Sequence, residues 1–198
     1  SKDGGLALDL MAEVVRKPAF APEAIERVRA QQLAAIDEEL DTPSAVARAL
    51  FNRAIYGEAH PLGRSAKGTK DTAKAITREQ IVAHHARFFV PKNATLAVVT
   101  DRDAADVLAL VEKAFGDWTG GDKPVVTTPA IPAPAARVMR KPVEAEQANI
   151  FLGHVGIERK DPDYTALAVF DNVFGTGSGF TSRLSMNVRD QKGLAYTV

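Results

Sequence analysis

Hydrophobic positions recur at helical spacing through most of the first 118 residues. Residues 6–15 form one such run. Two further helices should begin at Pro22 and Pro43, because a proline in the first helical turn lacks only an N–H that would be unpaired there in any case. Thr77 and Gln80 have the spacing of a capping box, which predicts another helix start. The pattern therefore predicts a helical first half.

Shorter and denser apolar runs mix with helical patterns in the rest of the chain. Runs typical of strands occupy residues 94–100, 137–140, 147–155 and 194–198. Helical spacing continues over residues 101–115, 162–174 and 180–192. Because strands and helices do not alternate regularly, the sequence predicts an α/β or α+β fold and not a βαβ repeat.

Residues 119–136 differ in composition from their surroundings. Gly120, Gly121 and four prolines interrupt any periodic pattern there. Clustered prolines favour an extended chain over a floppy one. We therefore predict a linker at 119–136.

Both ends of the chain have the pattern of a protein interior. The first residues lead directly into a helix, and residues 194–198 form an apolar strand that stops without a turn. A natural C-terminus rarely ends inside an apolar strand, because the strand edge needs a partner. This pattern predicts a piece of a longer protein.

Composition narrows the function classes. Among 198 residues, 25 basic and 25 acidic side chains give a net charge of zero, which argues against broad nucleic-acid binding. No apolar run approaches the roughly 18 residues that span a bilayer. The absence of cysteine removes disulfides, thiolate metal sites and cysteine nucleophiles.

The four histidines do not have the spacing of a metal site. His60, His84, His85 and His154 lie outside any H-x-x-E-H frame. His84 and His85 are adjacent, so on a helix they point about 100° apart. A zinc site needs three convergent protein ligands, so we expect solvated or core-edge histidines and no metal on this chain.

Other reactive residue types also lack a complete frame. The glycine-rich stretch 175–179 is not followed by Lys-Ser or Lys-Thr, which favours a flexible turn over a phosphate loop. Ser182 and Ser185 have no His partner nearby, and the carboxylates within 37–41 are typical of a solvated helix end. We therefore predict no autonomous active site and no catalytic residue on this chain.

Arg189 and Tyr196 form the most informative pair. Arg189 is expected near a helix end and Tyr196 on the following strand, with Gly193 in the turn between them. Such a bend can aim a guanidinium and a phenol at one point, where both donate hydrogen bonds to a carbonyl or a developing oxyanion. Spacing alone favours a surface arginine and a half-buried tyrosine, so both interpretations stay open on the residues.

An ordered series of short motifs resembles a known family. The series includes PAF at 18–20, IERVR at 25–29, YGEAHPLG at 56–63, PKNATLAVV at 91–99, GIERKDPDY at 156–164 and VRDQKGLAY at 188–196. Each motif is weak alone. In this order, over nearly the whole chain, they resemble the pitrilysin/insulinase (M16) family of zinc metallopeptidases, in particular bacterial members similar to mitochondrial processing peptidase.

The resemblance implies a role for the pair. In this family two halves enclose a chamber that degrades peptides. One half binds zinc through H-x-x-E-H and a later Glu, and the other is usually zinc-free and contributes an Arg and a Tyr, which Arg189 and Tyr196 match. Aligning Ile25 and Arg29 with the catalytic half places the later zinc ligand at Ala35, whose methyl group cannot bind zinc. The resemblance thus implies the non-catalytic half, with zinc on the catalytic partner half.

The fold implied by the resemblance is α+β, an M16-type α/β roll with a mixed sheet and helices packed on one face. Residues 1–118 would be the later half of one roll domain and residues 137–198 the earlier half of the next, joined by the linker 119–136. The strands at 94–100 and 147–155 would each lack neighbours, so we expect the halves to join as a circularly permuted roll. The same pairing between two chains would give a domain-swapped homodimer.

Three functions compete at this stage. The first is a non-catalytic part of a zinc peptidase that contributes chamber wall and an Arg/Tyr substrate clamp, with a catalytic M16 subunit or half and a peptide as partners. The second is a protease-derived scaffold or assembly subunit. The third, an active zinc peptidase, needs the ligand that Ala35 does not supply. Retention of Arg189 and Tyr196 favours the first, and the sequence does not distinguish a cytoplasmic from a periplasmic location.

Overall fold

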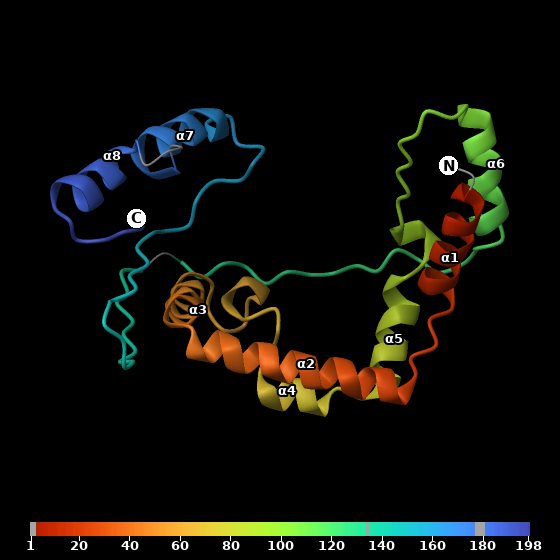
Figure 1. The fold of residues 1–198 in the computed structure, drawn as a ribbon, viewed down its shortest axis with the longest axis horizontal. Coiled ribbons are helices and arrows are strands. Elements are labelled where there is room, and N and C mark those ends of the chain that lie inside the picture. Colours follow the sequence, from red (N-terminus) through yellow and green to blue (C-terminus); the bar gives the residue numbers. More distant parts are fainter. Residues whose placement is uncertain (1–2, 134, 177–180) are drawn as a thin grey trace. The chain divides into compact units, whose positions relative to one another are not determined.

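A computed structural model describes residues 3–133, 135–176 and 181–198 of the chain (Figure 1). Backbone contacts divide the chain into two compact units, Ser1–Leu152 and Gly153–Val198. Over the described ranges, regular structure consists of α-helices with short 3₁₀ and π-helical turns. None of the helices in these ranges is long and apolar enough to cross a membrane.

The first unit contains the longer helices. They are α1 (Gly4–Arg16), α2 (Pro22–Asp41), α3 (Pro43–Tyr56), α4 (Lys70–Ala75), α5 (Arg78–Phe88) and α6 (Ala104–Phe115), with 3₁₀ turns at Pro61–Gly63 and Pro91–Asn93. The predicted proline starts of α2 and α3 are confirmed. The capping box is confirmed as well: the Thr77 hydroxyl accepts the N–H of Gln80, and the Gln80 side chain accepts the N–H of Thr77.

Helix α2 packs against both α3 and α4. Ile36, Val46 and Ala73 supply one buried side chain from each helix. Only part of the apolar side of α2 is covered, because Val28 and Leu40 keep 57% and 55% of their surface exposed. This helical group buries less than the sequence pattern alone suggests.

Helix α1 packs against α6, and both contribute a buried alanine, Ala12 and Ala114. The guanidinium of Arg16 fastens the two helix ends, since it donates to the Ala114 carbonyl at 3.0 Å and meets the Asp117 carboxylate at 2.7 Å. The ring of His85 on α5 bonds to the Val15 carbonyl at 2.8 Å. Long-range polar contacts therefore hold α5 and α6 to the first helix.

The second unit contains short helices and π-helical turns. They are α7 (Tyr164–Asp171), the π-helical turn Asn172–Thr176, α8 (Arg183–Ser185) and the π-helical turn Met186–Gln191. These cover most of the helical segments predicted for this region. The predicted glycine-rich turn at 175–179 falls largely on residues 177–180, which lie outside the described residues.

The predicted α+β roll with a mixed sheet is wrong, and so is its permuted assembly. Residues 94–100 and 147–155, expected as two strands of one sheet, run without regular structure, and the described parts of the chain contain no β-strand. The strands predicted at 137–140 and 194–198 are absent as well. The hydrogen bonds of a helix form within one segment, whereas a strand needs a second segment in register. These runs form no such strand pairing in the described parts of the chain.

Candidate functional site

The segment that carries Arg189 and Tyr196 begins at a buried serine cap. The Ser182 hydroxyl accepts the N–H of Ser185 at 3.2 Å and donates to the Ser185 hydroxyl at 3.0 Å. Both serines are buried, with 1% and 4% of their surface exposed. Their hydroxyls therefore start the helical segment, as N-cap serines do, and neither is placed as an exposed nucleophile.

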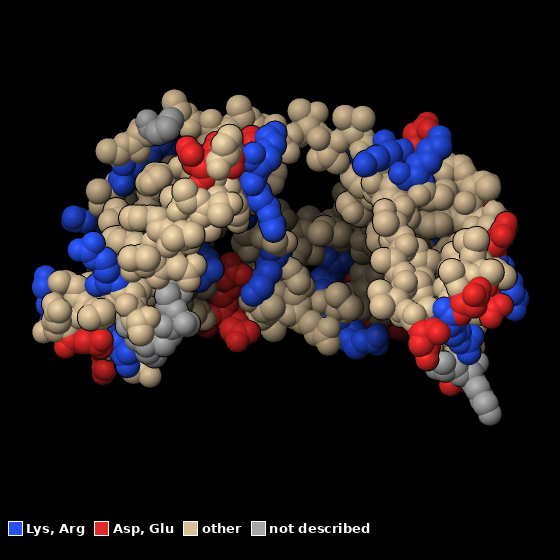
Figure 2. Space-filling model, turned by 90° about the horizontal axis from the view of Figure 1, so that it is seen from above, with Lys and Arg blue, Asp and Glu red and all other residues tan. Residues whose placement is uncertain are grey.

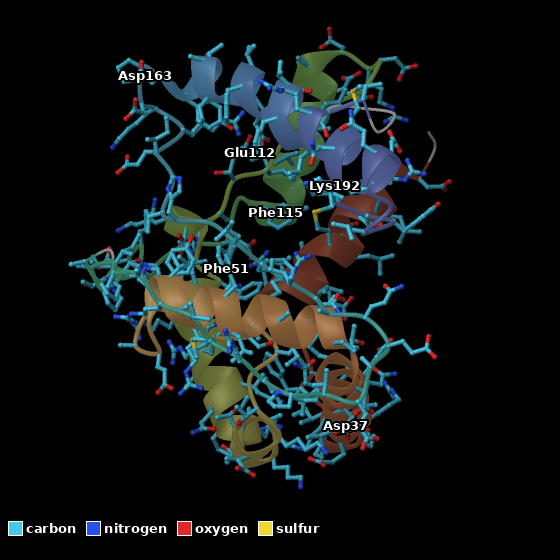
Figure 3. The ribbon with its side chains drawn as sticks, turned by 90° about the vertical axis from the view of Figure 1, so that its left-hand side faces the viewer. Asp37, Phe51, Glu112, Phe115, Asp163 and Lys192 are labelled. Carbon is cyan, nitrogen blue, oxygen red and sulfur yellow. The ribbon has the colours of Figure 1, made fainter. Side chains whose placement is uncertain are left out.

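The segment ends in a tight turn around Gly193. Its φ of +60° lies in the left-handed region that favours glycine. The N–H groups of Gly193 and Leu194 donate to the carbonyls of Arg189 and Val188, both at 3.0 Å. Lys192, labelled in Figure 3, stands directly before this turn. The turn reverses the chain so that residues after it approach the π-helical turn before it.

This reversal brings the two predicted residues together. The guanidinium carbon of Arg189 lies 5.1 Å from the centroid of the Tyr196 ring, within the range of a cation–π contact. The Arg189 side chain is 27% exposed, and its guanidinium is 4.0 Å from the Asp190 carboxylate. Tyr196 keeps 77% of its surface exposed, more than the half-buried tyrosine that spacing alone favours.

The arrangement presents two hydrogen-bond donors on one exposed surface. The Arg189 guanidinium lies over the ring of Tyr196, and the phenol of this exposed residue has no hydrogen-bond partner among the described residues. A guanidinium and a phenol together suit a carbonyl or carboxylate oxygen. The contact of this pair with a substrate stays a prediction.

The position that the resemblance aligns with the later zinc ligand is Ala35, and one lysine contacts its backbone. The Ala35 carbonyl accepts from the Lys67 ammonium at 3.3 Å, and the same ammonium is 3.1 Å from the Glu39 carboxylate. Lys70 pairs with Asp37, which Figure 3 labels on α2. Lysines thus pair with Asp37 and Glu39. Nowhere in residues 3–133, 135–176 and 181–198 do three His, Cys, Asp or Glu side chains gather as a metal site.

The histidines have local structural partners. His60 is buried, stacks on the Tyr56 ring at 5.3 Å and accepts the N–H of Leu62 at 3.1 Å. The adjacent pair diverges: His84 contacts the Phe88 ring, whereas His85 bonds to the backbone of α1. His154 bonds to a neighbouring carbonyl at 2.7 Å.

Sequence reasoning missed a second group of cations, on α3 and the turn that follows it. Arg48 and Arg64 line a groove beside α3. The spacing of Ser44, Arg48 and Asn52, four residues apart along the helix, is the signal that marks this polar face. On the face shown in Figure 2, basic and acidic side chains are interspersed, so charge composition alone does not reveal the group.

Comparison with known proteins identifies the family. Residues 75–198, well over half of the chain, match the family described as the peptidase M16 inactive domain. The chain therefore belongs to the M16 peptidase family and carries its inactive domain, and the predicted family and half are confirmed. Arg189 and Tyr196 lie within the matched residues.

Similar proteins extend beyond this chain. It is 32% identical over 197 residues to an uncharacterised zinc protease of Mycobacterium leprae and 30% identical over 200 residues to one of Streptomyces coelicolor; each match covers 98% of this chain and 43% of the relative. The crystal structure of a peptidase M16 inactive domain from Pseudomonas fluorescens matches with a TM-score of 0.73 and 28% identity, over 96% of this chain and 46% of that one. A protease structure from Helicobacter pylori shares the fold, with a TM-score of 0.68, 22% identity and coverage of 100% and 48%. The chain thus spans less than half the length of these relatives.

Proposed function

We propose that this chain acts as the non-catalytic half of an M16 zinc peptidase and that Arg189 and Tyr196 contact the peptide substrate. The observation that carries the proposal is the stack of the Arg189 guanidinium on the exposed Tyr196 ring. Two donors held side by side can bind the carbonyl oxygen of a bound peptide and stabilise charge that develops there. In this proposal the zinc ion lies on the catalytic partner half.

Exposed apolar side chains support a partner for each unit. In the first unit Val99, Ile150 and Leu152 expose 99%, 83% and 97% of their surface, and in the second Leu194 and Val169 expose 75% and 62%. Exposed apolar surface on this scale is typical of surfaces that another protein covers. We propose that a catalytic M16 half covers part of it and that the remainder forms chamber wall.

The proposed domain organisation is the one that the resemblance to M16 peptidases implies. Residues 1–118 and 137–198 would belong to two successive M16-type domains, with 119–136 as the linker. A second copy of the chain is the alternative partner for the same apolar surfaces, and an assembly of that kind would act as a scaffold without proteolysis. The Arg189–Tyr196 stack favours the peptidase role, because a scaffold has no use for exposed substrate donors.

The test is peptide turnover by the chain reconstituted with a zinc-bearing M16 catalytic half. Arg189→Ala and Tyr196→Phe should each lower kcat/KM for a quenched fluorescent peptide by about 10²–10³, as loss of one oxyanion donor does. Arg183→Ala and Tyr164→Phe are matched controls in the same unit, since both side chains are exposed, and they should leave turnover unchanged. Unchanged kcat/KM in both test variants, with assembly intact, would overturn the substrate contact and leave a structural role for the pair. Assembly without any peptide turnover would favour the scaffold function.

A further inference from the structure

A groove beside α3 has the features of a second ligand site, in the unit that does not contain Arg189 and Tyr196. It consists of a polar pocket of about 330 Å³ and an adjoining, mainly apolar pocket of about 870 Å³. The two share Glu39, Ala45, Arg64 and Ser65 among their lining residues, so they form one continuous depression.

One wall of the polar pocket is the first part of α3. Ser44, Arg48 and Asn52 face it from successive turns of the helix. The helix begins at Pro43 without a side-chain cap, so the N–H groups of Ser44 and Ala45 have no side-chain acceptor among the described residues. These N–H groups and the guanidinium of Arg48 point to an anionic occupant.

The opposite wall is a turn whose backbone has little freedom. The 3₁₀ turn Pro61–Gly63 packs so closely on Gly57 that a Cβ at Gly63 would run into the Gly57 carbonyl oxygen. The buried ring of His60 caps the start of the turn, because it accepts the N–H of Leu62. The next residue, Arg64, is therefore held at the rim of the groove by rigid backbone.

The charges around the groove do not cancel. Its two carboxylates already have partners, Glu39 with Lys67 at 3.1 Å and Glu58 with Arg53. Within the described residues the Arg48 guanidinium lies over the Phe151 ring, 5.5 Å from its centroid, and the side chains of Arg48 and Arg64 make no hydrogen bond or ion pair. The two arginines give the polar pocket an excess of positive charge with donors suited to a planar carboxylate.

The adjoining pocket is suited to a hydrocarbon group. Ile36, Leu40, Val46 and Pro61 line it, and Leu40 leaves 55% of its surface exposed beside the groove. Covering such apolar surface favours binding. Lys141 adds one more cation at this end.

We propose that this groove binds the free C-terminal carboxylate of a peptide whose last residues are apolar. The carboxylate lies between Arg48 and Arg64, and the last side chains occupy the apolar pocket. Ser44, Asn52 and Ser65 offer hydroxyl and amide groups to the adjoining peptide bond, which a simple fatty acid would leave unused. The proposal does not rest on the role of Arg189 and Tyr196.

The test is fluorescence polarisation with the 198-residue chain and the N-terminally labelled peptide Ala-Ala-Leu-Phe, as free acid and as C-terminal amide. The free acid should bind about tenfold tighter, because the amide lacks the charge-assisted hydrogen bonds. Arg48→Gln and Arg64→Gln should each weaken binding of the acid about three- to tenfold and leave that of the amide unchanged. The affinity of the acid should fall as salt increases, since the groove is open to solvent.

Two control variants distinguish binding in this groove from binding elsewhere on the chain. Arg140→Gln removes an exposed arginine outside the groove, and Arg189→Ala alters the proposed substrate contact, so both should bind the peptide as the parent chain does. Circular dichroism checks that the variants are folded.

Equal affinity for the peptide acid and the peptide amide would overturn the proposal. Displacement of the labelled peptide by inorganic phosphate, at the concentration at which unlabelled peptide acid displaces it, would also overturn the proposal. Binding of octanoate without binding of the peptide acid would overturn the peptide as ligand.

Discussion

The two units use arginine in opposite ways. In the first unit the Arg29 guanidinium donates to the carbonyls of Ala73, of Lys74 at 3.3 Å and of Ile76 at 2.8 Å. In the second unit Arg189 lies over a tyrosine ring that is 77% exposed. An arginine whose donors go to backbone carbonyls stabilises the fold, whereas the contact of Arg189 with an exposed ring is the basis on which we propose that it binds a ligand.

The role of Arg29 follows from the helix that it caps. Helix α4 has six residues, too few to be stable alone, and its last carbonyls have no partner within the helix. Arg29 reaches across from α2 to bond to them, and Glu26 holds its Nε at 3.2 Å. The residue that helped to align this chain with its family is therefore part of the packing of α2 on α4.

Replacing Arg29 should give the largest effect. Arg29→Ala leaves the end of α4 without donors and should lower the free energy of unfolding by about 2 kcal/mol, a magnitude typical of hydrogen bonds to a charged group. Urea unfolding followed by circular dichroism measures it. Arg27→Ala, on the same helix but exposed, is the control and should be nearly neutral. If Arg29→Ala left the free energy of unfolding unchanged, the contrast between Arg29 and Arg189 would not hold.

The Arg189–Tyr196 pair should have a smaller effect on stability. Exposed cation–π contacts are worth about 0.5–1 kcal/mol, so loss of this contact in Arg189→Ala should lower the unfolding free energy by about that amount. Tyr196→Phe keeps the ring and should change stability by less than about 0.5 kcal/mol. The same urea measurement applies. A loss as large as that expected for Arg29→Ala would show that the pair is structural.

The smallest effect should come from the ion pair between α1 and the end of α6. The hydrogen bond from Arg16 lowers the pKa of Asp117, and the Arg16 charge acts in the same direction. A carboxyl whose pKa is lowered by folding contributes stability above its unfolded pKa of about 3.9, and this contribution is lost as the pH falls through the lower folded value.

Thermal unfolding between about pH 2 and pH 7 tests this contribution. Asp117→Asn should lower Tm near neutral pH and make the decrease of Tm toward low pH slightly smaller. Both changes should be small, because the Asp117 side chain is 76% exposed. Asp9→Asn, an exposed carboxyl on α1, should keep the parent profile. If Asp117→Asn showed the same dependence of Tm on pH as the parent chain, the ion pair between Arg16 and Asp117 would not contribute to stability as expected.

Local signals predicted the helices well. The starts at Pro22 and Pro43 and the cap at Thr77 depend on groups within one turn of the chain, so they can be read from the sequence. The proximity of Arg189 and Tyr196 was also predictable, because they are seven residues apart around a glycine turn. The family followed from the order of motifs along the chain.

The strands and the groove were not predictable in the same way. Runs such as 94–100 have the composition of strands, but strand pairing depends on a second segment far along the chain, and the described structure supplies none there. The groove depends on Arg64 meeting the face of α3 that carries Arg48, a contact set by the close packing of Gly63 on Gly57. The sequence pattern does not indicate that Gly63 packs on Gly57, so it could not predict the groove.

The sequence by itself determined the helices, the family and the short-range pair, because each depends on neighbours within a few residues or on the order of motifs. Only the tertiary structure decided that Arg29 caps α4, that Lys67 contacts the Ala35 carbonyl, and that Arg48 and Arg64 share one groove. These facts join residues from separate elements. Their distances depend on how helices pack, and packing is a property of the folded chain as a whole.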